Sequence, residues 1–188
     1  MEITFENILL PEGTFKVEVI KYIEEDRLRL KNIYYKWREL STELRSMSGR
    51  GINLPEVLSE SAFCLEMSAV RVISSISGAN SSWDCYDIKR DKRIQIKACS
   101  VLPDLTSFGP KSQWDELYFM DFFKKGNWDG SFDIYFIPNE LVYEHKVNER
   151  QTLKDQQQQG KRPRFSIFKE LIIPNNIKPL KTGNLSIQ

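Results

Sequence analysis

Three polar side chains near the middle of the chain have the types and the spacing that phosphate hydrolysis requires. Residues 85–89 (CYDIK) and 93–99 (RIQIKAC) predict two short strands joined by a polar turn. Side chains alternate between the two faces of a strand, so Gln95 and Lys97 share one face. We expect the turn to bring Asp87 toward them, which would place a carboxylate, an amide and an ammonium on one surface.

These residue types suit a metal-dependent reaction. Mg²⁺ prefers oxygen ligands, and proteins hold it with one or two carboxylates together with water and substrate phosphate. A neighbouring lysine can orient or deprotonate the attacking water and stabilise charge on the phosphate. The spacing Asp-x7-Gln-x-Lys from Asp87 to Lys97 therefore predicts a magnesium site for phosphodiester hydrolysis. A solvent-exposed hairpin with one polar face produces the same string by chance, so the flanking elements must support the interpretation.

Two helices are predicted before this hairpin. Between about residues 24 and 47, apolar residues recur at three- and four-residue steps, which indicates an amphipathic helix with Ile33, Trp37, Leu40, Leu44 and Met47 on its buried face. A second helix opens at Pro55, because proline suits the first helical turn, and its apolar stripe runs to Val72. Glu60 lies beside that stripe and is expected to add a carboxylate to the metal site. A carboxylate on the helix surface is the alternative, and Glu56 and Glu66 are weaker candidates for the same role.

A glutamine-rich and basic stretch follows the predicted sheet. Residues 151–166 (QTLKDQQQQGKRPRFS) form a loop in which arginine can pair with guanine and glutamine with adenine in the major groove. Lysines in the same loop can contact phosphates. The candidate DNA-binding residues are Lys154, Gln156, Gln157, Lys161, Arg162 and Arg164, with Ser107 and Lys111 from the long loop over residues 101–113. A solvated polar loop is the alternative.

The predicted elements fit one α/β domain of 188 residues, built on a central mixed sheet flanked by helices. Further strands are expected over residues 116–123 and 132–137, and a short final helix over 168–172. Residues 1–50 would hold the N-terminal segment and first helix, 51–138 the catalytic core and 139–173 the DNA-reading loop with the final helix. A poorly ordered tail is expected over 174–188.

Composition removes several classes of function. His145 is the one histidine in the sequence, which disfavours Ser-His-Asp hydrolases, histidine-based nucleases and zinc sites. The three cysteines lack CxxC spacing and are expected to be reduced and buried in a cytoplasmic protein. No apolar run is long enough to cross a bilayer and no signal peptide is recognisable, so no membrane partner is expected. The net charge is +1, but basic residues gather over 150–169, where phosphate can dock.

Four stretches together resemble small type II restriction endonucleases of the PD-(D/E)xK class. They are residues 51–60 (GINLPEVLSE), 87–97, 107–110 (SFGP) and 151–164. The closest likeness is to a family that cuts GC-rich, two-fold-symmetric sites of the GC-N-GC kind. The third and fourth stretches are more specific than the second, because many nuclease families share the catalytic pattern.

The resemblance implies a restriction-endonuclease-like fold, Mg²⁺ as cofactor, double-stranded DNA as substrate and ends with 5′-phosphate and 3′-hydroxyl groups. It implies Asp87 as the principal metal ligand and Lys97 as the catalytic lysine. Gln95 stands where the family has glutamate, so a neutral carbonyl would reach the metal and Glu60 would supply the missing charge, or the site is weak or inactive. A symmetric DNA site implies a homodimer, for which the aromatic cluster Tyr34, Tyr35 and Trp37 is a candidate surface.

Three other functions remain open at this point. A structure-specific repair or junction nuclease would share Asp87 and Lys97 but read DNA shape. A DNA-binding module that has lost its chemistry is consistent with Gln95. A protein-interaction domain without nucleic acid requires the basic residues between Lys161 and Arg164 to be accidental.

Overall fold

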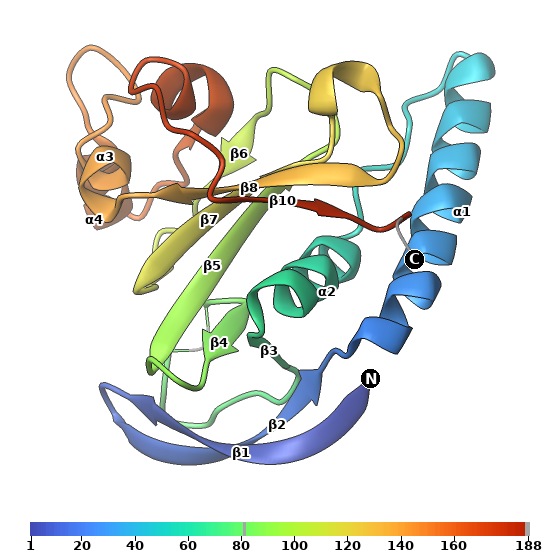
Figure 1. Cartoon of the computed structure of the whole chain (residues 1–188). Coiled ribbons are helices and arrows are strands. Elements are labelled where there is room, and N and C mark those ends of the chain that lie inside the picture. The colour runs from blue at the N-terminus through green and yellow to red at the C-terminus, as the bar shows by residue number, and fades with distance from the viewer. Residues whose placement is uncertain (81, 187–188) are drawn as a thin grey trace.

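A curved sheet of eight strands organises the protein (Figure 1). The computed structural model describes residues 1–80 and 82–186; one residue of the linker before the hairpin and the last two of the predicted tail lie outside this range. The elements are β1 (Glu2–Leu10), β2 (Gly13–Lys21), η1 (Glu24–Asp26), α1 (Arg27–Ser46), α2 (Glu56–Met67), β3 (Val70–Val72), β4 (Cys85–Asp87), β5 (Lys92–Cys99), β6 (Thr106–Ser107), β7 (Glu116–Asp121), η2 (Lys124–Gly126), β8 (Ser131–Ile137), α3 (Asn139–Tyr143), α4 (Leu153–Gln158), β9 (Arg164–Phe165), η3 (Phe168–Ile172) and β10 (Lys181–Asn184).

The large sheet is mixed, as the sequence predicts. Its strands run in the order β1-β2-β3-β4-β5-β7-β8-β10. Strands β5 and β7 are parallel, and the other described neighbours in this sheet are antiparallel. Strands β6 and β9 form a separate two-stranded sheet. The prediction of a mixed α/β architecture with helices around a sheet is confirmed at this level.

The two faces of the sheet are covered by different parts of the chain. Helices α1 and α2 pack on the face that carries Ile94 and Ile96, and they lie to one side of the sheet in Figure 1. The other face carries Phe119 and is covered by the segments of α4, β6, β9 and η3. The assignment of Ile94 and Ile96 to one face and Gln95 and Lys97 to the other is therefore confirmed.

Helix α1 forms where predicted, but it buries a different stripe. Its buried residues are Leu30, Tyr34, Trp37, Arg38 and Ser41, whereas the predicted inward residues Ile33, Leu40 and Met47 are exposed. Both stripes have helical spacing, and the one with the larger aromatic side chains faces the core because it buries more apolar surface. Since Tyr34 and Trp37 are buried within the subunit, the predicted aromatic dimer surface is wrong for these two residues.

Helix α2 begins at Pro55 as predicted and ends earlier than predicted. Pro55 is the N-cap residue, with φ −62° and ψ 128°, which suits the entry to a helix. Ser68 adopts a left-handed conformation with φ 55° and terminates the helix. The following Val70–Val72 forms strand β3, for which β-branched valines are well suited, so the predicted helical stripe to Val72 is wrong.

Two segments expected to lack regular structure have it. Leu153–Gln158 forms α4, with Thr152 as its N-cap residue. The hydroxyl of Thr152 accepts a hydrogen bond from the backbone N–H of Asp155, and the carboxylate of Asp155 accepts one from the backbone N–H of Thr152. The predicted tail contains β10, an edge strand paired with β8. Gly183 within β10 lies against the ring of Phe132, and a Cβ there would come within 2.4 Å of it, so a glycine is required for this strand to pair.

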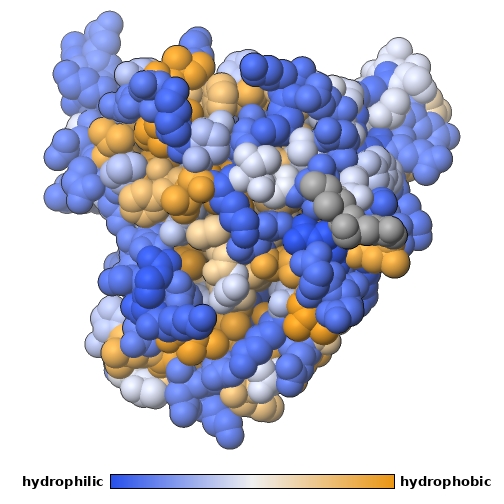
Figure 2. Space-filling view, in the orientation of Figure 1, coloured by the Kyte–Doolittle hydropathy of each residue, from blue (hydrophilic) through white to orange (hydrophobic). Residues whose placement is uncertain are grey.

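The surface of the protein is mainly hydrophilic in the orientation of Figure 2, with hydrophobic atoms gathered in part over the lower region that β1 and β2 occupy in Figure 1. Ile3, Phe5 and Leu9 alternate along the edge strand β1 and are 55%, 60% and 54% exposed. Within the described residues, no helix combines the length and the apolar character needed to cross a membrane.

Candidate active site

A cleft opens where strand β5 lacks a neighbour. Strand β4 pairs with β5 only from Lys92 to Ile94, so the edge of β5 beyond Ile94 is uncovered on that side. The cleft has a volume of about 520 Å³ and is bounded by the N-terminal end of α2, the free edge of β5 and the loop that carries β6. Its polar lining consists of Asn53, Glu56, Ser59, Glu60, Asp84, Gln95, Lys97, Ser100, Asp104, Thr106, Ser107 and Arg162.

Asp84, just before β4, places a carboxylate in this cleft. Its backbone N–H donates to the carbonyl of Ile94 at 2.9 Å, and its Oδ2 accepts from the N–H of Ile96 at 2.7 Å. The same oxygen accepts a hydrogen bond from Nε2 of Gln95. The carboxylate thus satisfies a strand N–H that a longer β4 would have bonded, and it lies beside Gln95 on the face that also carries Lys97.

The predicted position of Asp87 beside Gln95 and Lys97 is wrong. The turn over residues 88–91 is tight, so Asp87 pairs with Lys92, about 17 Å along β5 from Lys97 at roughly 3.4 Å per residue. Residues directly opposed across two strands share a face, which puts Asp87 on the Ile94 face and Lys97 on the other. Asp87 instead pairs with Arg90 at 2.6 Å.

Burial sets the electrostatics of the cleft. Removal from water raises the pKa of Asp84 to about 7. The hydrogen bond from the N–H of Ile96 and the positive charge of Lys97 oppose this rise, whereas the negative charges of Glu60 and Glu56 add to it. Burial also lowers the pKa of Lys97, against the attraction of Asp84 and Glu56, while Arg162 adds to the lowering. An acid and a base with pKa values drawn toward neutrality are typical of a catalytic site.

The structure brings Glu60 and Glu56 to the same cleft, both from α2. Glu60 forms an ion pair with Arg71 of β3, and its side chain is 13% exposed, so it is not the fully solvated surface carboxylate that was the alternative. Glu56, the weaker candidate, lies one helical turn before it and also faces Asp84. Glu66, the other weak candidate, is bonded to Arg27 and Lys181 and does not line the cleft.

Whether this cleft suits a divalent cation depends on its donors. Among the described residues, no three His, Cys, Asp or Glu side chains are close enough together to hold a metal. The donor set here is mixed, with the carboxylate of Asp84, the amide of Gln95 and the backbone carbonyl of Ile96 at one strand edge and glutamates opposite. Burial raises the pKa of Asp84 most, and the charges of Glu60 and Glu56 add to this by repulsion, which a cation would relieve. Such oxygens fit Mg²⁺.

Gln95 is 5% exposed and its amide nitrogen faces Asp84. In this orientation its carbonyl oxygen points away from the Asp84 carboxylate. Because the nitrogen and oxygen of an amide are exchanged by a half-turn about the last side-chain bond, the oxygen reaches the position beside Asp84 without moving the backbone.

The predicted DNA-binding residues divide into three groups. Arg162 and Ser107 line the cleft itself, and the buried hydroxyl of Ser107 has no hydrogen-bond partner among the described residues. Gln157 donates to the carbonyl of Gly109 at 2.7 Å. The remaining candidates lie outside the cleft lining; Gln156 is half-buried, and the exposed ones are Lys154, Lys161, Arg164 and Lys111.

Asp84 is the functional candidate that sequence reasoning missed. A signal for it exists, because a hairpin with a tight turn pairs residues at equal distances from that turn. With the turn at residues 88–91, Cys85 faces Ile94, and the next residue outward on each strand is Asp84 and Gln95. Asp104 also lines the cleft, but its carboxylate is engaged by Ser166, Ile167 and Phe168, so it caps the C-terminal turn.

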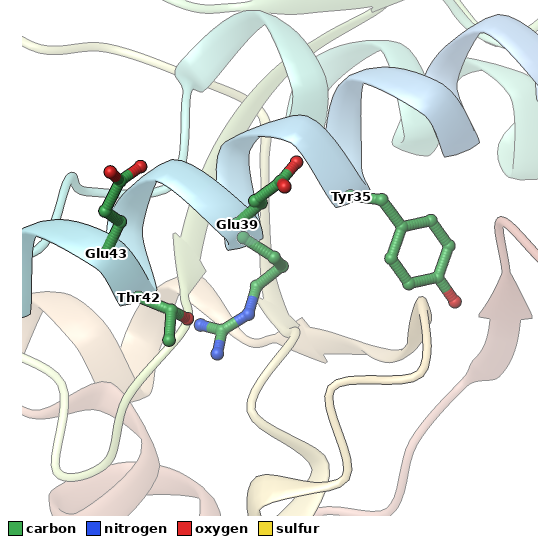
Figure 3. Close-up of a pocket in the computed structure, with 5 residues that line it drawn as sticks. Tyr35, Glu39, Thr42 and Glu43 are labelled. Atoms are coloured by element: carbon green, nitrogen blue, oxygen red, sulfur yellow. The ribbon is translucent and has the colours of Figure 1, made fainter. Parts of the chain in front are cut away.

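A larger hollow of about 780 Å³ lies on the outer surface of α1 (Figure 3). It is lined by Tyr35, Arg38, Glu39, Thr42 and Glu43. Figure 3 shows Glu39 and Glu43 projecting from the same side of the helix, one turn apart. All its lining residues come from a single helix and none of them is a lysine, so we assign the chemistry to the cleft at β5.

Comparisons with known proteins identify the family of the chain. A model of the family described as Bsp6I restriction endonuclease matches residues 22–174, which include every cleft residue. The type II restriction enzyme Bsp6I of Bacillus sp. (strain RFL6) is 33% identical over 165 residues, covering 85% of this chain and 90% of that enzyme. No solved structure matches the chain. The family match runs from before α1 to the end of η3, and together with the relative it shows that the chain belongs to the Bsp6I restriction endonuclease family.

Proposed function

We propose that this chain is a Mg²⁺-dependent type II endonuclease of the PD-(D/E)xK class that hydrolyses phosphodiester bonds in double-stranded DNA at a short, symmetric, GC-rich site. The observation that carries the proposal is the convergence of Asp84, Gln95 and Lys97 at the free edge of β5. In this interpretation Asp84 takes the role that the sequence suggested for Asp87. Gln95 takes the place of the second acidic residue of the class.

Each cleft residue has a proposed role that follows from its position. Asp84, the carbonyl of Gln95 and Glu60 would hold the metal ion, which when bound supplies polarisation of the scissile phosphate and stabilisation of the charge that develops there. Lys97, whose pKa is lowered by burial, would orient the attacking water and take a proton from it. Arg162 at the opposite wall of the cleft offers a guanidinium to a phosphate oxygen.

DNA recognition is assigned to the segment that follows the cleft. Helix α4 carries Lys154 and Gln156, and the turn after it carries Lys161 and Arg162. Arginine and glutamine side chains can read guanine and adenine edges, and lysines can contact phosphates. A two-fold-symmetric site calls for a homodimer with one cleft for each strand. The outward apolar residues of β1, centred on Phe5, are the surface that we assign to the dimer.

Cleavage of unmethylated plasmid DNA with Mg²⁺, followed by sequencing of the ends, tests this proposal. We expect a defined fragment pattern with one sequence at every end, no products with EDTA and none with Asp84→Asn or Lys97→Ala. Asp87→Asn is the matched control and should cut the same sites. Random ends, or cutting only of branched DNA, would contradict a sequence-specific enzyme.

A catalytically inactive DNA-binding module is the second candidate, and Gln95 is the observation that favours it. A neutral amide supplies no charge to a cation, so the cleft has one carboxylate fewer than an acidic residue at this position would give. In that case the wild-type protein would bind a duplex as tightly as Lys97→Ala does, and neither would cut with Mg²⁺ or Mn²⁺.

A further inference from the structure

The aromatic ring of Phe108 lies against the candidate catalytic lysine. Nζ of Lys97 is 5.6 Å from the centroid of this ring, within the range of a cation–π interaction. Phe108 is completely buried. It belongs to the 107–110 stretch (SFGP), in which Ser107 lines the cleft but Phe108 has no role in the chemistry described so far. The ring stacks on Phe165 with centroids 5.3 Å apart and lies 5.8 Å from the ring of Trp114.

The same short stretch is attached to the DNA-binding candidates at four points. The N–H of Phe108 donates to the carbonyl of Pro163 at 3.0 Å. Ser107 pairs with Arg164 in the small sheet. Gln157 of α4 donates to the carbonyl of Gly109, and Phe165 of β9 stacks on the Phe108 ring. Residues 153–165, which we call the reading segment, therefore cannot move without moving the backbone that holds Phe108.

We propose that Phe108 is a positioning residue that holds the Lys97 ammonium group in the cleft and couples its position to the reading segment. The proposal rests on the proposed function, in which Lys97 acts on the phosphate and residues 153–165 contact DNA. It adds a physical link between the two. Docking of the reading segment on its DNA site would fix the ring of Phe108, and the ring would fix the amine.

The surroundings of Lys97 explain why an aromatic side chain is useful at this position. Burial removes water from an ammonium group. The negative face of an aromatic ring replaces part of the lost electrostatic attraction to water without adding a charge. The charged groups that face Lys97 are Asp84 before β4, Glu56 and Glu60 from α2, and Arg162 from the reading segment. An aliphatic residue would fill the same space but would offer no negative ring face to the ammonium.

Nuclear magnetic resonance titration of Lys97, with lysine labelled at the side chain, tests the contact independently of cleavage. Phe108→Leu and Phe108→Met keep an apolar side chain and remove the ring, and each should lower the pKa of Lys97 by roughly 0.5 to 1 unit, a threefold to tenfold change in the ionisation constant. The matched control is Phe168→Leu. Phe168 belongs to the same side of the sheet and contacts Phe119 and Tyr135. The Phe168→Leu substitution should leave the Lys97 titration unchanged.

Kinetics then test the coupling. Phe108→Leu should reduce kcat about tenfold and shift the lysine limb of the pH–rate profile to lower pH, while affinity for a site-containing duplex, measured in an Asp84→Asn background, stays within about twofold of wild type. Unchanged titration and unchanged kcat in Phe108→Leu would overturn the proposal, as would an equal loss of kcat in Phe168→Leu without a shift in the profile. If wild-type protein cuts no DNA, the proposed function fails, whereas a shifted Lys97 titration in Phe108→Leu would still support the contact.

Discussion

Replacement of Asp84 by asparagine should make the metal-free protein more stable and inactive at the same time. The pKa of Asp84 rises from 3.8 to about 7 on folding because the carboxyl group is removed from water. A folded-state pKa above the unfolded value means that the folded protein binds the proton more tightly. Stability is therefore lost as the pH rises through the window from 3.8 to about 7.

The magnitude follows from the size of the shift. Roughly 3 pH units at 1.36 kcal/mol per unit gives a cost of about 4 kcal/mol at pH 8, where the folded carboxylate is ionised. At pH 5 the folded group is still protonated and the cost is about 2 kcal/mol. Asparagine keeps an oxygen that can accept from the N–H of Ile96, but it leaves Lys97 without one attractive partner. The cleanest quantity is therefore the difference between the two pH values.

Urea unfolding of wild type and Asp84→Asn at pH 5 and pH 8, in EDTA, measures this difference. The gain in free energy of unfolding caused by Asp84→Asn should be about 2–3 kcal/mol larger at pH 8 than at pH 5. Asp87→Asn is the control, because Asp87 is bonded to Arg90 at the far end of the hairpin; it should produce no such pH-dependent gain. An equal change at both pH values, or a less stable Asp84→Asn protein at pH 8, would refute the electrostatic argument.

Three further predictions follow from the cleft and the surface around it. Gln95→Glu should tighten Mg²⁺ binding in calorimetry without abolishing cleavage, and it should destabilise the metal-free protein at pH 8 by about 1–2 kcal/mol, because it adds a carboxylate beside Asp84; unchanged metal affinity would exclude Gln95 as a ligand. Arg162→Ala should lower the single-turnover cleavage rate by roughly tenfold to a hundredfold, whereas Lys154→Ala should mainly weaken DNA binding and reduce the slope of its salt dependence by about 1. Phe5→Glu should convert a dimer to a monomer in light scattering after gel filtration, and a wild-type monomer at the same concentration would contradict the β1 surface.

The hairpin shows which features a single sequence can predict. Alternation along residues 93–99 correctly assigned the faces of Gln95 and Lys97, because a period of two is a local property of any strand. The register with the preceding strand is not local, since it depends on how many residues the turn uses. A first strand assumed to run to Lys89 favoured Asp87, whereas the structure ends β4 at Asp87 and uses residues 88–91 for the turn. An error of this kind exchanges the two faces of the strand.

The predictions for the α1 and β10 segments were wrong for a different reason. In α1 two apolar stripes have the same helical spacing, so the period identifies the helix but not the stripe that faces the sheet. In β10 the residues Lys181 to Asn184 are polar because the strand lies at an edge, and its place in the sheet depends on the contact between Gly183 and Phe132. The strand propensity of residues 181–184 carries no information about a partner about 51 residues earlier in the sequence.

The presence of glutamine at position 95 is consistent with the charge balance of the cleft. Asp84 already faces the charges of Glu60 and Glu56, and their repulsion adds to the burial that raises its pKa. A fourth carboxylate, within hydrogen-bond reach of Asp84, would increase this repulsion in the metal-free protein. A neutral amide instead donates to Asp84 and keeps the strand edge in place. Under the proposed function, the cleft would need a cation mainly when substrate phosphate brings further negative charge. Glutamine in place of an acidic residue at position 95 is therefore expected to weaken metal binding more in the absence of DNA than in its presence.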